Sequence, residues 1–415
     1  MAHSDLISFF LQICTMLVVA LFAGQIMRML HQPAVLGELV GGIFLGPTVF
    51  GLLAPEAFNW LFPSEGQAAL GLDAVIKIGM LFFLFAAGLE VNLTHLRQRS
   101  LAVVSTSVMG VLLPFALGGA SVFLWPGLWG SQAEKQTMIF ALFIGAALSI
   151  SALPVIARVL IDLNLIQKEI GFVVMTAATI NDLIGWSLFA VILSVVVPGS
   201  SDRGVWLTLS LVVGFAALIL ILGYRLGQPI MHWVASSMLW PNGFIGVVAV
   251  LVLVAAILAE TIGLHAIFGA FLVGVALGQS FEKENQARES IYQFAVSFFA
   301  PLYFVSIGLR ADFAANFDGP LVLLILLIAC VGKILGAGIG ARLGGMQPRE
   351  ALAVGFGMNA RGAMEIILAS VALEYRLIDQ RIFVGLVIMA LVTSLLSGPM
   401  MQRLIKETPG HAETA

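Results

Sequence analysis

The chain has 415 residues, of which 60% are hydrophobic and only 10% charged, and its formal net charge is −3. A soluble domain carries about 25% charged residues, so this chain lacks the polar side chains for a water-facing surface of that size. The slight negative charge gives no sign of nucleic-acid binding.

Apolar runs recur from residue 6 to residue 405, and dividing them at polar, proline and glycine clusters gives thirteen. A helix needs roughly 20 apolar residues to cross the hydrocarbon core. We therefore predict an all-α polytopic membrane protein of about 13 transmembrane helices over residues 1–405, followed by a short cytoplasmic tail at 406–415. The predicted spans are 6–29, 33–53, 68–90, 101–125, 136–160, 169–197, 205–231, 243–261, 264–281, 291–309, 319–343, 350–374 and 380–404.

Basic residues between the spans set the expected orientation. Alternate loops and the tail hold twelve of them, whereas the opposite loops hold five. Cytoplasmic loops carry the excess of Lys and Arg, so the C-terminus is expected in the cytoplasm and the N-terminus outside. The N-terminus lacks the basic region of a signal peptide, so we expect the first span to be retained. The twelve are Arg28, Arg97, Arg99, Arg158, Lys168, Arg225, Lys283, Arg288, Arg342, Arg349, Arg403 and Lys406; the five are Lys135, Arg203, Arg310, Arg376 and Arg381.

A charge near the middle of a span costs free energy, so such residues usually face a cavity and are functional. Glu38 and Lys77 are the first two along the chain. Lys77 is either a second partner for Asp182, considered below, or the structural partner of Glu38, and the sequence leaves both readings open.

The fifth span is interrupted. Pro154 follows a run of small and hydroxylated residues that includes Ser149 and Ser151. Proline removes a backbone donor and crowds the carbonyl one turn earlier, which predicts a break in this helix. Unwound backbone at that depth is tolerated beside protein or a wet cavity.

The sixth span contains Asp182, flanked by about a helical turn of apolar residues on each side. Thr179 lies three residues earlier on the same helical face, and Asn181 is a neighbour that cannot ionise. We interpret Asp182 as an ion-binding carboxylate; the alternative is an acid that only bonds a neighbouring helix.

The eleventh span contains a buried charge, as the sixth does, and the twelfth span is interrupted, as the fifth is. Lys333 lies in the middle of the eleventh, where it either pairs with Asp182 or extends its ammonium to an interface. Asn359, Arg361 and two glycines interrupt the twelfth, and Glu365 follows four residues after Arg361, close enough to pair with it on one helical face. We expect Pro154, Asn359, Arg361 and Glu365 to support the breaks. Two interrupted spans at corresponding positions indicate a transporter binding site.

Five strings in order resemble the cation/proton exchanger domain of the monovalent cation:proton antiporter superfamily, in the branch of plant cation/proton exchangers, bacterial potassium efflux antiporters and sodium/proton antiporters. The resemblance covers nearly the whole chain. The strings are ALSISALPVIARVL (147–160), TAATINDLIGW (176–186), GLHAIFGAFLVGV (263–275), PLYFVSIGLRADF (301–313) and GMNARGAMEIILA (357–369).

This resemblance implies two inverted repeats, two crossed broken helices, a mobile core domain and a dimerisation domain. It also implies a homodimer that works by an elevator-like motion. The family's ion-binding aspartate matches Asp182, and its second-repeat lysine matches Lys333. Electrogenic sodium/proton members carry an acid where this chain has Asn181, which favours exchange of one cation per proton. The plant likeness favours K⁺ over Na⁺.

The hypothesis is therefore a secondary antiporter of the inner or plasma membrane that uses no cofactor. One carboxylate holds either a proton or a cation, with neutral oxygen ligands from Thr179, Asn181, Ser149 or Ser151. Burial disfavours the charged form of Asp182, and Lys333 favours it. A cation channel and a non-transporting ion sensor are the alternatives. An intramembrane aspartyl protease needs two deep aspartates, and only Asp182 lies deep, so an enzyme is not expected. Regulation would act through the membrane part or a separate subunit.

Overall fold

The computed structural model describes residues 3–30, 32–91, 101–163, 165–166, 168–196, 205–237, 242–278 and 285–406. All regular structure within these ranges is helical, as predicted. Nine segments there are long and apolar enough to cross a membrane, and three further apolar helices are shorter. The count of thirteen crossings and the inverted repeats stay predictions. Arg97, Arg99, Arg203, Lys283 and the tail at 407–415 lie outside the described residues.

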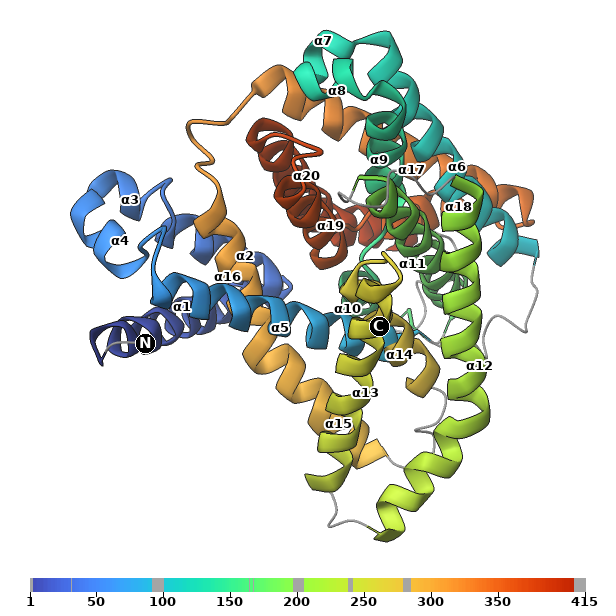
Figure 1. Cartoon of the computed structure of the whole chain (residues 1–415). Helices are drawn as coiled ribbons and strands as arrows, with labels where there is room; N and C mark the ends of the chain where they lie inside the picture. Colours follow the sequence, from blue (N-terminus) through green and yellow to red (C-terminus); the bar gives the residue numbers. More distant parts are fainter. Residues whose placement is uncertain are drawn as a thin grey trace. The chain divides into compact units, whose positions relative to one another are not determined.

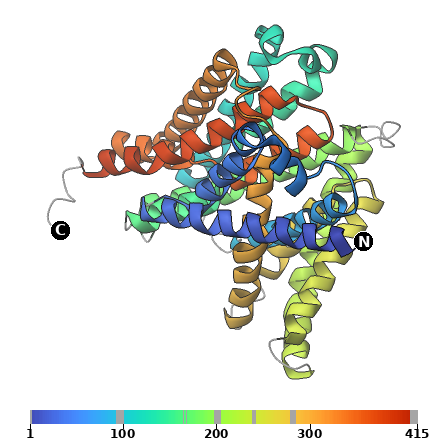
Figure 2. The same cartoon turned by 90° about the vertical axis from the view of Figure 1, so that its left-hand side faces the viewer.

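The chain divides into two compact units, each made of two stretches of sequence. The first comprises residues 1–93 and 193–315. Its long first helix runs across the front of Figure 2 in dark blue. The helices of this unit are α1 (His3–Met29), α2 (Ala34–Leu45), α3 (Phe50–Leu53), α4 (Pro55–Leu61), α5 (Gln67–Glu90), α12 (Val205–Ser237), α13 (Asn242–Thr261), α14 (Ala266–Gly278), α15 (Asn285–Phe294), a π-helical turn (Ala295–Phe299) and α16 (Ala300–Arg310).

The second unit comprises residues 94–192 and 316–415. It contains all the residues predicted to form the ion site. Its helices are α6 (Leu101–Leu124), α7 (Pro126–Trp129), α8 (Ser131–Lys135), α9 (Thr137–Ser149), α10 (Leu153–Asp162), α11 (Glu169–Val196, whose last four residues pass into the first unit), α17 (Gly319–Leu343), α18 (Pro348–Met358), α19 (Ala363–Glu374) and α20 (Gln380–Lys406).

The predicted spans correspond to observed helices, with differences at glycine and proline positions. The predicted split between the spans at 243–261 and 264–281 is confirmed, since α13 ends at Thr261 and Gly263 adopts a positive φ of 80°. The predicted second span corresponds to the apolar segment Ala34–Leu53, within which α2 ends at Leu45 and the chain turns at Gly46 and Pro47 before α3. Proline there removes a backbone donor and favours an extended preceding residue.

A seam of glycines brings α17 into close contact with α6 (Figure 1). Gly332, Gly336 and Gly340 recur every fourth residue on α17, so they share one face. Each lies against the α6 backbone, at Pro114, Met109 and Ser105 respectively. Small residues at this spacing let two helices approach closely inside a membrane. The seam places Lys333, the residue after Gly332, next to α6.

Gly336→Val is expected to destabilise the protein by about 1–3 kcal/mol, the usual cost of overpacking a close contact. A Cβ at this position would overlap the carbonyl oxygen of Met109. Thermal unfolding in detergent measures the loss. Gly214→Val on α12 is the matched control, since a Cβ there meets no atom within 4 Å. Equal loss in both variants would show that the β-branched side chain, and not the seam, is responsible.

Candidate functional site

Two interrupted helices of the second unit touch at their breaks. α9 ends at Ser149 and α10 begins at Leu153; α18 ends at Met358 and α19 begins at Ala363. The Ala152 amide donates to the Ala360 carbonyl at 2.9 Å, and the Ser151 hydroxyl donates to the Met358 carbonyl at 3.0 Å. The predicted breaks in spans five and twelve are therefore present, and they lie against each other.

Pro154 lies in the first turn of α10, just after the break. A first-turn residue of a helix has no intrahelical acceptor for its amide, so proline is tolerated there. Residues 150–152, which precede it, do not continue α9. The predicted interruption of span five is confirmed, at residues 150–152.

The C-terminal end of α9 is capped by two buried cations. The Arg361 guanidinium donates to the carbonyls of Ala147 at 3.3 Å and Leu148 at 2.6 Å. The Lys333 ammonium donates to the carbonyl of Ser149. The last carbonyls of a helix lack intrahelical partners and carry partial negative charge. Arg361 and Lys333 therefore neutralise a helix end that would otherwise be unsatisfied inside the protein.

Lys333 is fully buried, so the alternative in which it extends to an interface is excluded. Besides Ser149, its ammonium donates to the carbonyl of Gly110 at 3.1 Å. Oriented to satisfy its neighbours, the Asn181 amide accepts from Lys333 at 3.1 Å and donates to the carbonyls of Ser107 and Ala177. Three oxygens thus match the three N–H groups of a charged lysine. Asn181 fixes the end of Lys333 beside α11.

Asp182 lies next to this cluster. Its side chain is 1% exposed, and it interacts electrostatically with Lys333. Arg361 and Glu365 also act on Lys333, so the site contains two cations and two carboxylates. A buried charge is tolerated when opposite charges and hydrogen bonds compensate it. The pairing of Asp182 with Lys333 stays a prediction.

Three hydroxyl groups predicted as neutral ligands are buried near these residues. Thr179 donates to the Met175 carbonyl at 2.9 Å, one turn back on α11. Ser149 donates to the carbonyls of Gly145 and Val111. Because each hydroxyl, like that of Ser151, gives its proton to a carbonyl, its oxygen keeps lone pairs for a cation. The role of these hydroxyl oxygens as cation ligands stays a prediction.

Arg361 and Glu365 form the predicted ion pair, with 3.0 Å between Nη1 and Oε1, and both side chains are buried. The prediction that they share a helical face is wrong: Arg361 lies in the break, before α19 begins, and Glu365 lies in the first turn of α19. A carboxylate is favourable there, beside the positive end of the helix dipole. Asn359 donates to Cys330 Sγ at 3.5 Å, and the Ser394 hydroxyl donates to the Arg361 carbonyl.

Some contacts escaped the sequence analysis. In the first unit Lys77 pairs with Asp73 at 3.2 Å, and Asp73 pairs with Arg310 at 3.5 Å. Asp73 was not considered as a partner of Lys77, although their i, i+4 spacing is a usable signal. Gly110 and Ser394 were also missed, because a carbonyl acceptor or a lone serine leaves no signature in the sequence.

Comparison with known proteins identifies a matching family and similar relatives. The family described as "Sodium/hydrogen exchanger, transmembrane" matches residues 16–407. The chain is 32% identical to the Na(+)/H(+) antiporter NhaS4 of Synechocystis, over 94% of each protein. It is 33% identical to Cation/H(+) antiporter 18 of Arabidopsis thaliana over 95% of its own length, which is 49% of that relative, so it spans about half of the plant protein.

A solved structure has a similar fold. The sodium proton antiporter MjNhaP1 from Methanocaldococcus jannaschii superposes with a TM-score of 0.70 and 18% sequence identity. The match covers 97% of this chain and 99% of that one. The arrangement of helices is thus shared along nearly the full length of both proteins.

Proposed function

The chain belongs to the sodium/hydrogen exchanger family, and from this premise we propose that it is a secondary active antiporter exchanging K⁺ or Na⁺ for protons at Asp182. The observation that carries the proposal is the buried cluster of Lys333, Asn181 and Asp182 beside the end of α9. A buried carboxylate with a fixed counter-charge is a chemically sensible site for one proton or one cation.

In the proposed mechanism, a proton and a cation compete for Asp182. Taking a carboxylate out of water disfavours its charged form, and a nearby cation such as Lys333 restores it. Oxygens of Thr179, Asn181, Ser149 and Ser151 supply neutral ligands for the metal ion, since hard cations prefer oxygen. Either ligand neutralises the carboxylate, which lowers the cost of moving the site through an apolar environment. The empty charged site moves poorly, and this keeps the two fluxes coupled.

The two compact units support the proposal of a mobile core domain and a separate dimerisation domain. We assign residues 94–192 and 316–415, which hold the breaks and the site, to the mobile core domain. Residues 1–93 and 193–315 form the proposed dimerisation domain of a homodimer. In this proposal the protein spans the membrane with its N-terminus outside and its C-terminus in the cytoplasm.

Flux measurements in proteoliposomes test the proposal. Uptake of labelled Na⁺, K⁺ or Rb⁺ should be driven by an outward proton gradient and should saturate with cation concentration. Both Na⁺ and K⁺ are needed, since the relative NhaS4 is named for Na⁺ whereas the sequence resemblance favours K⁺. Flux that does not saturate and ignores the counter-ion gradient would indicate a channel. Cation binding without any uptake would indicate a sensor.

Exchange is expected to be electroneutral, with one cation moving per proton. Asn181 cannot supply a second carboxylate, and three oxygen acceptors surround the Lys333 ammonium in this structure. A neutral amine would leave one of these oxygens without a donor. Current recorded from proteoliposomes on a solid support should therefore stay at background while pH-sensitive dye reports proton movement. A transport current that reverses with membrane potential would contradict this stoichiometry.

A further inference from the structure

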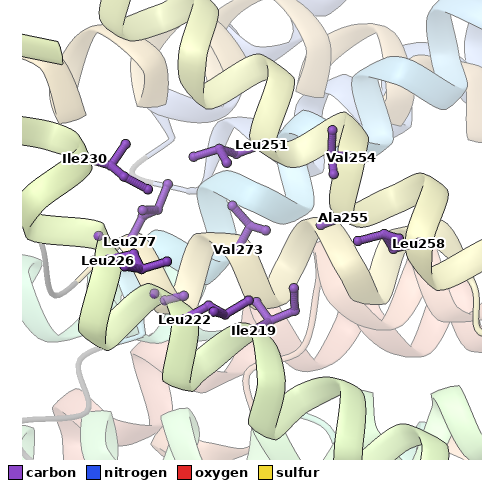
Figure 3. Close-up of a pocket in the computed structure, with 13 residues that line it drawn as sticks. Ile219, Leu222, Leu226, Ile230, Leu251, Val254, Ala255, Leu258, Val273 and Leu277 are labelled. Carbon is purple, nitrogen blue, oxygen red and sulfur yellow. The ribbon is translucent and has the colours of Figure 1, made fainter. Parts of the chain in front are cut away.

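Two features of the described residues have no role in the proposed mechanism. One is an apolar groove of about 220 Å³ on the first unit, between α12, α13 and α14 (Figure 3). All 13 residues that line this groove are apolar, so it offers no side chain that could bind or position an ion. The other is a pair of buried serines on α20, Ser394 and Ser397, which lie in the same unit as the ion site.

One face of α20 packs against a half of each interrupted helix. Ser394, Gly398 and Met401 follow one another at spacings of four and three residues, so they share this face. A Cβ added to Gly398 would lie 3.6 Å from the Val159 side chain of α10, and a Cβ added to Gly357 of α18 would lie 3.3 Å from Met401 Sδ. α20 also contacts α19, which runs beside it in Figure 1.

Ser394 attaches the second break to α20. Its hydroxyl donates to the carbonyl of Arg361, and the two residues are 2% and 0% exposed. Arg361 lies before α19 begins, so its carbonyl is outside the hydrogen-bond ladder of that helix. A buried carbonyl needs a donor, and here the donor comes from a helix that runs through 27 residues. The hydrogen bond therefore holds the backbone of the break against a long regular helix.

Other carbonyls of this break are held by the first break. The Ser151 hydroxyl donates to the carbonyl of Met358, and the Ala152 amide donates to the carbonyl of Ala360. These two hydrogen bonds join one interrupted segment to another. The bond from Ser394 to the next carbonyl along the chain adds an anchor outside the two breaks.

Arg361 connects this anchor to the ion site. Its guanidinium caps the end of α9, and the last carbonyl of that helix, on Ser149, accepts from Lys333. Lys333 in turn bonds Asn181, the residue before Asp182. Because the reach of a side chain starts at its own backbone, a hydrogen bond that fixes the Arg361 carbonyl also limits where its guanidinium lies.

We propose that Ser394 is a positioning residue for the ion site: its hydroxyl holds the backbone of Arg361 and, through the cap on α9, fixes the surroundings of Lys333 and Asp182. The inference rests on the proposed cation/proton exchange at Asp182. A site that is held in its binding geometry needs less ordering when the cation binds, and so binds it more tightly. Ser394 acts on cation affinity in this proposal, and only through Arg361.

Ser394→Ala tests the proposal, because it removes the hydroxyl and little else. In proteoliposomes, the cation concentration that gives half-maximal uptake should rise about two- to tenfold, the fold-change equivalent to one net hydrogen bond. The maximal rate per folded molecule should change less. A residue that only stabilises the fold would reduce the number of folded molecules, which lowers the maximal rate and leaves the half-maximal concentration unchanged.

Ser397→Ala is the matched control. It is the same substitution three residues further along α20, at a serine that is 1% exposed and whose hydroxyl bonds none of the described residues. The half-maximal cation concentration should stay at the value of the unmodified protein. Unfolding temperatures in detergent show whether both variants are folded.

Hydrogen–deuterium exchange provides a second measurement that does not depend on transport. The Ala152 amide bonds the carbonyl of Ala360, the residue before Arg361, so its exchange rate reports on the contact between the two breaks. In folded protein this amide should exchange about two- to tenfold faster in Ser394→Ala than in Ser397→Ala, through local opening.

The two measurements separate this inference from the proposed function. An unmodified protein that moves no cations would contradict the proposed antiport, and the Ala152 amide would still test whether Ser394 holds the break. Equal exchange of the Ala152 amide in both variants overturns the proposal. So does a half-maximal cation concentration that Ser394→Ala leaves unchanged in a protein that transports.

Discussion

Asp182→Asn is expected to reduce cation/proton exchange to the level of vesicles without protein. The amide keeps the size and hydrogen-bonding atoms of the carboxylate but cannot release a proton or balance a cation. The side chain is buried, so its neutral form removes a costly charge and should leave the fold intact. The measurement is proton-driven uptake of labelled Na⁺ and Rb⁺ in proteoliposomes, at matched protein density.

Two variants give this experiment its control. Asp182→Glu keeps a carboxylate on a longer side chain and should keep some exchange, with altered cation affinity. Glu134→Gln neutralises an exposed carboxylate on α8 of the same unit and should leave exchange unchanged. Unfolding temperature and elution from a sizing column show whether each variant is folded. Proton-coupled uptake that survives in folded Asp182→Asn would contradict the assignment of Asp182 as the site that binds both the proton and the cation.

The interrupted helices were predictable from the sequence because their causes are local. Pro154 acts on the backbone within a turn, and the polar residues Asn359 and Arg361 interrupt an apolar run, so both signals are visible at their own positions. The charge of Asp182 is likewise informative alone, since an ionisable residue in an apolar run is costly wherever it points. These local features are therefore enough to predict the candidate site from the sequence alone.

The connections between these residues were not predictable in the same way. Nothing in the sequence states that Arg361 and Lys333 reach the end of α9, because the contacts join residues 213 and 184 positions apart. The glycine repeat of α17 was readable, yet only packing shows that α6 is its partner. Asp73 was not predicted as a partner of Lys77 because it lies near the start of a span, where a charge costs little free energy and gives no signal of function.

The capping of α9 gives Arg361 a role that the sequence did not predict. Arg361 was expected to support the break in which it lies. Instead, Arg361, which lies in one break, satisfies carbonyls at the end of the other interrupted helix. Lys333 completes the cap while it also bonds Asn181, beside Asp182. The end of α9 and the proposed ion site therefore share a residue, so movement of one affects the other.

Arg361→Met is expected to destabilise the protein by about 3–5 kcal/mol, the usual cost of removing one partner of a buried ion pair. The change leaves the buried Glu365 carboxyl without its partner, and it uncaps two carbonyls of α9. Chemical or thermal unfolding in detergent measures the loss. Arg381→Met is the control, because its ion pair with Asp318 is partly exposed and worth less than about 1 kcal/mol.

A double-mutant cycle separates the two contributions. Arg361→Met combined with Glu365→Leu removes both charges, so the cost of an unpaired carboxylate disappears and part of the stability should return. The remainder measures the uncapped carbonyls of α9, at about 1–3 kcal/mol per unsatisfied group. Exchange per folded molecule should survive in the double variant, because Arg361 and Glu365 hold the break and do not carry the ions. Stability that returns in full would show that the cap on α9 contributes nothing, and exchange lost from a stable double variant would place the pair in ion transfer itself.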